Sequence, residues 1–209
     1  MKIICLARNY MSCTDSISEQ FSPLVCNRPL AFFMKPDSAL LKDGRPFFIP
    51  DFSADIRFSA HLVVRICRLG KCIAARFARR YYDAVTVGVD FTAYDILQTC
   101  LSNGLPWDLN KCFDGSAVIG TFVSLEQLQT DVRQLAFRLE SDGHCIQQGF
   151  ASDMLTPVDE AIANLSQYMT LKMGDLIFTG APGNMSRATI GMHLQGYLGE
   201  REVLGFNLR

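Results

Sequence analysis

The sequence lacks the features that identify several large classes of protein. No hydrophobic run approaches the roughly 20 apolar residues that span a bilayer, and the run at the N-terminus ends before Arg8, too early for a secretion signal. No GxGxxG or Walker-type loop is present. The net charge is −1, with 20 basic and 21 acidic residues mixed along the chain, so nothing predicts binding to nucleic acid or a membrane. We expect a cytoplasmic protein.

The chain has cysteines but no spacing that pairs them. Its eight cysteines are scattered, with no CxxC pair and no zinc-finger spacing, so we expect most to be reduced core residues. A Pro-, Gly- or Ser-rich linker is also missing. Because 49% of the 209 residues are hydrophobic, the chain is long enough to bury one sizeable core. We predict a single domain over residues 1–209.

Short apolar segments predict several strands. We expect strands over residues 2–7, 85–89 and 176–178, the second of them rich in β-branched residues. Asp142-Gly143 is a strong hairpin signal and predicts pairing of residues 135–139 with residues 144–148. Residues 193–208 indicate a last hairpin.

Helical signals are fewer. We predict helices over residues 73–82, 94–102 and 157–168. Asn103-Gly104 suits a left-handed cap that ends the second helix, and Thr156 is a candidate cap at the start of the third. Residues 11–28 show no clear period and are interpreted as a loop or lid.

The most informative segment covers residues 55–66, which predict a strand that ends in a buried apolar run. Successive side chains on a strand point to opposite faces. Arg57, Ser59 and His61 therefore share one face, and apolar residues occupy the other. We expect these three polar groups to converge.

Six motifs, in order along nearly the whole chain, resemble those of the fumarylacetoacetate hydrolase family. They are Ala7-Arg8-Asn9-Tyr10, Phe33-Met34-Lys35-Pro36, Asp90-Phe91-Thr92-Ala93-Tyr94-Asp95, Gly104-Leu105-Pro106-Trp107, Lys111-Cys112-Phe113-Asp114 and Phe178-Thr179-Gly180-Ala181-Pro182-Gly183. The family includes acylpyruvate hydrolases, oxaloacetate decarboxylases and dienedioate isomerases. The resemblance implies an α+β, mainly β fold with a rolled mixed sheet, and a homodimer.

The resemblance also implies a metal site, but this sequence departs from it. Typical members hold Mg²⁺ or Mn²⁺ with two glutamates of a His-x-Glu-x-Glu strand and a later aspartate. Arg57, Ser59 and His61 stand at the strand positions, and only Asp90 remains. One carboxylate does not hold Mg²⁺ tightly, so we expect no resident metal cofactor. An alternative is Zn²⁺ or Fe²⁺ on His61, Asp90 and Cys13.

The lid departs from the family too. The histidine and glutamate that activate water in hydrolytic members correspond to Cys13 and Ser16, and neither is a useful base near neutral pH. Cys13 stays a candidate catalytic thiol, with an ordinary free thiol as the alternative interpretation. The resemblance makes Lys111 the catalytic cation that stabilises an enolate or oxyanion.

Other matched positions imply a pocket for a small 2-oxo acid or dicarboxylate. The residues implied in substrate binding are Arg8, Tyr10, Gln147 and Thr179, to which we add Arg57. Our hypothesis is that Arg57 replaces the positive charge of the missing ion and pairs with Asp90, directly or across a bound anion. The alternative is that Arg57 reaches solvent at the rim.

Two function classes follow. The first is an enzyme acting on a small 2-oxo acid by C–C hydrolysis, decarboxylation or keto–enol isomerisation. The second is a catalytically silent relative that serves as a binding or scaffold subunit. The resemblance favours the first class, whereas the replaced metal and lid residues favour the second.

Overall fold

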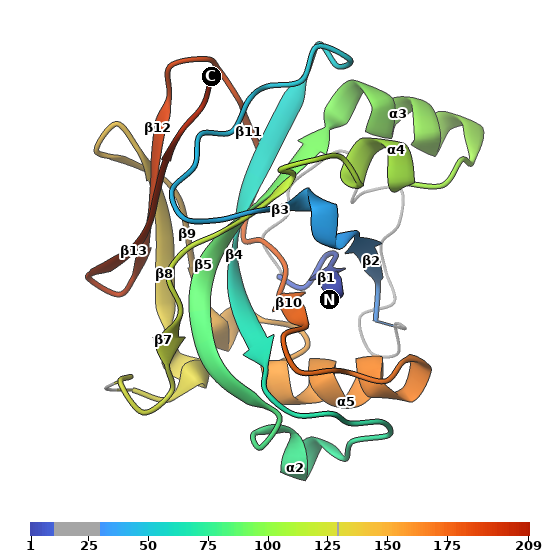
Figure 1. Ribbon diagram of the computed structural model, residues 1–209, viewed down its shortest axis with the longest axis vertical. Helices are drawn as coiled ribbons and strands as arrows, with labels where there is room; N and C mark the ends of the chain where they lie inside the picture. Colours follow the sequence, from blue (N-terminus) through green and yellow to red (C-terminus); the bar gives the residue numbers. More distant parts are fainter. Residues whose placement is uncertain (11–29, 129) are drawn as a thin grey trace.

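The computed structural model describes residues 1–10, 30–128 and 130–209. Within these ranges no helix has the length and apolar character needed to cross a membrane. The lid expected over residues 11–28, with Cys13, lies outside the described residues. The described chain folds into two β-sheets with four α-helices around them (Figure 1).

The larger sheet is mixed and has nine strands. Its main path runs in the order β2-β1-β10-β4-β5-β6-β3, with β11 beside β4 and β7 beside β5. The pairs β1–β10 and β3–β6 are parallel, and the others are antiparallel. The strands are β1 (Ile3–Leu6), β2 (Phe32–Lys35), β3 (Leu40–Leu41), β4 (Ile56–Ile66), β5 (Tyr82–Ala93), β6 (Ala117–Ile119), β7 (Val123–Ser124), β10 (Leu176–Phe178) and β11 (Ser186–Arg187).

The smaller sheet is antiparallel, with the order β13-β12-β8-β9. Its strands are β8 (Ala136–Ser141), β9 (His144–Phe150), β12 (His193–Leu198) and β13 (Arg201–Asn207). The α-helices are α2 (Ala75–Ala78), α3 (Tyr94–Asn103), α4 (Asp108–Lys111) and α5 (Val158–Tyr168), and three short 3-10 turns cover Asp37–Ala39, Val132–Gln134 and Ala151–Asp153. The expected mainly β architecture with a rolled mixed sheet is confirmed.

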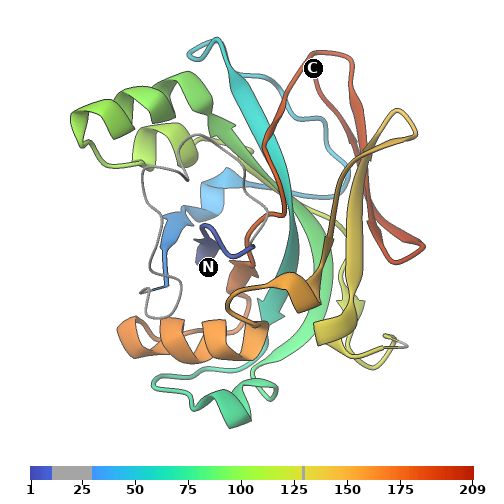
Figure 2. The same cartoon turned by 180° about the vertical axis from the view of Figure 1, so that it is seen from behind.

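The long strands β4 and β5 divide the molecule into two sides. Figures 1 and 2 show the smaller sheet on one side of this pair, and α3, α4, α5 and the N-terminal strands on the other. On the first side the alternate apolar residues of both strands form the main core. Phe91 of β5, for example, meets Phe206 of β13 edge to face, with ring centroids 6.2 Å apart. The second side receives the polar residues of the same strands.

Several local predictions are confirmed. Helix α3 ends at Gly104, whose φ of +63° gives the left-handed cap that its sequence indicates. The turn between β8 and β9 has φ values of +50° at Asp142 and +80° at Gly143, as expected of a two-residue hairpin. The last hairpin is formed by β12 and β13.

Two helix predictions need correction. The helix expected over residues 73–82 is a single turn, α2, because Tyr82 already pairs with Ile66 at the start of β5. Thr156 does not cap α5, since Pro157 takes the cap position and no side chain caps the helix. The backbone N–H of Thr156 instead donates to Asn9 Oδ1, 2.7 Å away.

Candidate functional site

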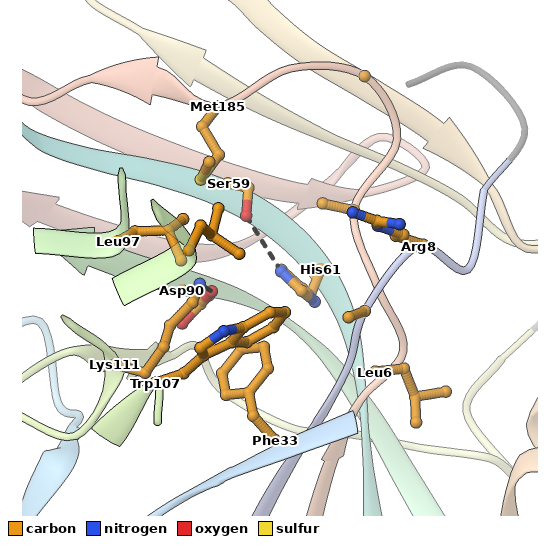
Figure 3. Close-up of a pocket in the computed structure, with 14 residues that line it drawn as sticks. Leu6, Arg8, Phe33, Ser59, His61, Asp90, Leu97, Trp107, Lys111 and Met185 are labelled. Carbon is orange, nitrogen blue, oxygen red and sulfur yellow. Dashed lines mark hydrogen bonds and ion pairs between the residues drawn. The ribbon is translucent and has the colours of Figure 1, made fainter. Parts of the chain in front are cut away.

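A cavity of about 170 Å³ opens on the polar side of β4 and β5. It is smaller than the roughly 300–1,000 Å³ of sites for drug-sized ligands, and so suits a small molecule. Figure 3 shows the lining side chains, which come from β2, β4, β5, α3, α4, the end of β1 with the residues after it, and the turn after β10. The polar ones are Arg8, Ser59, His61, Asp90 and Lys111, and the apolar ones include Leu6, Phe33, Leu97, Leu101, Trp107 and Met185.

The floor of the cavity is an ionic cluster centred on Asp90. Lys111, at the end of α4, places its Nζ 2.7 Å from Asp90 Oδ2. Lys35, at the end of β2, places its Nζ 2.8 Å from Asp90 Oδ1. Lys111 Nζ also contacts the hydroxyl of Thr92 at 2.5 Å. With two ammonium groups and one carboxylate, the cluster carries a net charge of +1.

Lys35 is the site residue that sequence analysis missed. Its side chain is completely buried, and four acceptors lie within hydrogen-bond distance of the three N–H groups of its Nζ: Phe91 O at 3.0 Å, Lys111 O at 2.6 Å and both oxygens of Ser116. Because these bonds use its N–H groups, Asp90 Oδ1 gains the charge of Lys35 but accepts no hydrogen bond. A lysine at the end of an apolar strand, inside the matched Phe-x-Lys-Pro motif, was the available signal.

Burial and charge act in opposite directions on these groups. Burial would raise the pKa of the Asp90 carboxyl, but the charges of Lys111 and Lys35 outweigh it and hold that pKa below its usual range. Burial lowers the pKa of Lys35, and the neighbouring Asp90 charge partly opposes that effect. The carboxylate is therefore kept ionised and occupied by its two cations.

Ser59 and His61 lie beside this cluster on β4. Ser59 is the direct cross-strand neighbour of Asp90, and its Oγ lies 3.1 Å from His61 Nε2. The backbone N–H of Gly180 donates to His61 Nδ1 at 3.1 Å. Burial lowers the pKa of His61 from 6.5 to about 4, although the Asp90 charge opposes it. His61 is therefore neutral at physiological pH.

Arg57 does not take the position that we expected. Its guanidinium pairs with Asp55, with Nη2 2.9 Å from Oδ2, and stacks 3.6 Å from the centre of the Tyr94 ring. The direct Arg57–Asp90 pair is wrong, because Asp90 is already held by Lys35 and Lys111. Arg57 is also not among the residues that line the cavity. Of the three polar residues expected to converge, only Ser59 and His61 do so.

The remaining predicted residues divide between the cavity and its support. Arg8 lines the cavity and has a φ of +56°, a region that non-glycine residues rarely adopt. Gln147 lies behind β4, where its Oε1 accepts from the Ala60 N–H at 2.6 Å and its amide contacts Pro182 O. Thr179 Oγ1 donates to Leu62 O at 2.9 Å, and Tyr10 packs edge to face against Phe137. The last three do not line the cavity, so their roles in substrate binding stay predictions.

The described residues do not fit a divalent metal at this site. Asp90 is the only acid among the described residues that line the cavity, and both of its oxygens face ammonium groups. The Nδ1 lone pair of His61 is used by Gly180. Over residues 1–10, 30–128 and 130–209, no three His, Cys, Asp or Glu side chains gather as ligands. Hard cations require several oxygen ligands, which this set does not offer.

The sequence and the fold are similar to those of proteins named for reactions of small oxo acids. The mitochondrial oxaloacetate tautomerase FAHD1 of Rattus norvegicus is 32% identical over 180 residues, which are 86% of this chain and 79% of the relative. The oxaloacetate tautomerase YcgM of Escherichia coli is 28% identical, over 92% of this chain and 86% of the relative. The structure of fumarylpyruvate hydrolase from Pseudomonas aeruginosa in complex with Mn²⁺ and pyruvate superposes with a TM-score of 0.88 and 27% identity, covering 100% of this chain and 89% of that one.

The family itself is shown by a match over nearly the whole chain. The sequence pattern of the fumarylacetoacetate (FAA) hydrolase C-terminal domain matches residues 2–204. The chain therefore belongs to the fumarylacetoacetate hydrolase family, and the resemblance inferred from its six motifs is confirmed.

Proposed function

We propose that this chain binds a small 2-oxo acid in the cavity through its cations, without a divalent metal. The observation that carries the proposal is the surplus of positive charge at the cavity floor, where Lys35 and Lys111 share the single carboxylate of Asp90. A ligand carboxylate would balance that charge. The pyruvate named in the structure of the P. aeruginosa relative supports the same class of ligand.

The chain contains its own probe for this binding. Trp107 is the only tryptophan, and its side chain lines the cavity. We expect oxalate, titrated in the presence of EDTA, to change the Trp107 fluorescence in a saturable way. Lys111→Met should weaken binding by at least about tenfold, because it removes a charge-assisted hydrogen bond. Lys71→Met, which removes an exposed cation far from the cavity, is the matched control.

The outcomes of this titration are distinct. Wild-type protein that shows no saturable response to oxalate, by fluorescence or by calorimetry, contradicts the proposal. A response that requires added Mg²⁺ or Mn²⁺ contradicts its metal-free part. A circular dichroism spectrum of the Lys111→Met protein distinguishes lost binding from lost folding. If that variant does not fold, Arg8→Ala provides the second test, since Arg8 lines the same cavity.

A second candidate function is catalysis of the keto–enol interconversion of oxaloacetate. It is favoured by the relatives of that name, one of which aligns with 86% of this chain. The two candidates differ in proton transfer at C3 of oxaloacetate. Exchange of the C3 hydrogens in D₂O, followed by proton NMR with and without Mg²⁺, separates them. Exchange faster than in buffer would identify an enzyme, and an unchanged rate would favour the catalytically silent binding subunit.

A further inference from the structure

Ser59 and His61 are two buried polar residues of the cavity that lie outside the ionic cluster. Their contact, Ser59 Oγ to His61 Nε2 at 3.1 Å, has the appearance of a serine nucleophile beside its base. The position of the proton on the His61 ring decides whether His61 accepts a hydrogen bond from Ser59, as a base would, or donates one to it. Gly180 settles it, because its backbone N–H donates to His61 Nδ1. A backbone amide is always a donor, so Nδ1 carries the lone pair.

The proton of a neutral His61 must then reside on Nε2, where it points at Ser59. In serine hydrolases the arrangement is the reverse: Nδ1–H donates to a carboxylate, and the Nε2 lone pair takes the serine proton. His61 has no lone pair on the serine side. It cannot act as the base for Ser59, and the pair is not a nucleophilic dyad.

The same proton position leaves Ser59 as a donor. Its Oγ accepts the Nε2–H of His61, so its own O–H must point elsewhere. Among the described residues, His61 is the only hydrogen-bond partner recorded for this hydroxyl. Ser59 is 4% exposed and lines the cavity. Since buried polar hydrogens are almost always paired, this one requires an acceptor on the cavity side, a position that a bound ligand can take from water.

We infer that Gly180, His61 and Ser59 form a donor relay that directs the Ser59 hydroxyl hydrogen to the oxo oxygen of a bound 2-oxo acid. The inference rests on the proposed function, because it assigns one atom of the same ligand. Each member donates to the next, from the Gly180 amide through the imidazole to the hydroxyl. Figure 3 shows the contact between Ser59 and His61. Ser59 contacts the ligand, and His61 is a positioning residue.

The relay has a chemical consequence for the oxo group. Fixed donors aimed at an oxygen that gains negative charge stabilise the oxyanion or enolate form. The imidazole withdraws electron density from the hydroxyl that it donates to, so the Ser59 hydrogen becomes a better donor. Ser59 and His61, which stand where the family pattern has glutamates, would thus polarise the carbonyl group of the ligand without a charge of their own.

The test compares two ligands that differ only at the oxo oxygen. Pyruvate and propionate share the carboxylate, but only pyruvate offers an acceptor to Ser59. In wild-type protein with EDTA, Trp107 fluorescence should show pyruvate binding about fivefold to tenfold tighter than propionate, as one hydrogen bond predicts. Ser59→Ala should remove this preference and leave the affinity for propionate unchanged. Ser59→Thr, which keeps the hydroxyl, should restore it.

The outcomes separate the inference from the function on which it rests. If neither acid binds wild-type protein, the proposed function fails. If pyruvate binds and Ser59→Ala keeps the preference, binding stands and the relay is wrong. The relay has an independent readout in the ¹⁵N shifts of His61, assigned by their loss in His61→Gln. A neutral ring protonated on Nε2 at pH 7 supports it, and protonation on Nδ1 overturns it.

Discussion

The two longest strands of the sheet, β4 and β5, pair from Ile56 to Ile66 but bring different chemistry to the same cavity. β5 supplies Asp90 and Thr92 to a cluster of charges, and β4 supplies the neutral Ser59 and His61. The charged cluster is completed from β2 and α4 and makes no use of β4 side chains. The cationic floor is therefore assembled without an acidic side chain from β4.

The ion pairs of β5 should dominate stability. Asp90→Asn removes the carboxylate that pairs with two buried ammonium groups, and uncompensated buried charges of this kind cost about 3–5 kcal/mol. We expect a loss of that size in the free energy of unfolding, measured with urea. Asp83→Asn is the matched control, because its partner Arg65 is 40% exposed and such pairs contribute about 0–1 kcal/mol. Equal losses in the two variants would mean that the cluster at Asp90 is not stabilising.

His61 of β4 should contribute to the pH dependence of the free energy of unfolding. The pKa of His61 falls from 6.5 to about 4 on folding, so between these values the unfolded chain holds a proton that the native protein does not. Stability must then decrease as the pH falls through this window, by about 3 kcal/mol in total. Urea unfolding at several pH values should show a shallower slope for His61→Gln. The exposed His144→Gln should keep the wild-type slope.

Below about pH 4 the pH dependence of stability comes instead from Asp90 in the ionic cluster of β5. The pKa of Asp90 is lower in the folded protein than in the unfolded chain, so its contribution is present above about pH 4 and is lost as the pH falls further. The two strands thus have separate pH windows. A slope between pH 6.5 and 4 that persists unchanged in His61→Gln would show that His61 does not titrate as its burial implies.

Placing acids on β4 tests whether the residues at positions 59 and 61 determine metal affinity. Ser59→Glu with His61→Glu returns the two glutamates of the family pattern opposite Asp90. We expect this variant to bind Mn²⁺ at least about tenfold tighter than wild type, because hard cations require anionic oxygens. Electron paramagnetic resonance of free Mn²⁺ measures the change. Ser59→Gln with His61→Gln has similar volume without charge, and equal affinity in the two double variants would contradict the prediction.

Much of the fold was predictable, because local chemistry determines local structure. Glycine and, to a lesser degree, aspartate tolerate positive φ, so Asp142-Gly143 and Gly104 predict turns from sequence alone. All three residues do have positive φ in the structure. The two-residue alternation placed Ser59 and His61 on one face of a strand, and the cavity confirms it. The helix expected over residues 73–82 failed because β5 recruits Tyr82, and strand pairing outweighs helix propensity there.

The charge pairing of the site could not be predicted in the same way. Lys35 and Lys111 are 76 positions apart and meet at Asp90 only through the sheet order, which no local pattern encodes. The hypothesis that a cation replaces the missing ion beside Asp90 named Arg57, whereas the structure has Lys35 in that role. The alternation of β4 does set the face of Arg57, but its long side chain turns to the nearer Asp55.

Substitution of Arg57 should therefore have the smallest effect on stability and ligand affinity, and it tests whether Arg57 lies outside the binding site. It is paired with a carboxylate that is 22% exposed and stacked on Tyr94, contacts that contribute about 1 kcal/mol or less at a surface. Arg57→Gln should lower the free energy of unfolding by no more than this and change oxalate affinity, followed by Trp107 fluorescence, by less than about twofold. A tenfold loss, like that expected for Lys111→Met, would return Arg57 to the binding site. Because both residues are cations on the same side of the sheet, the contrast tests placement and not charge alone.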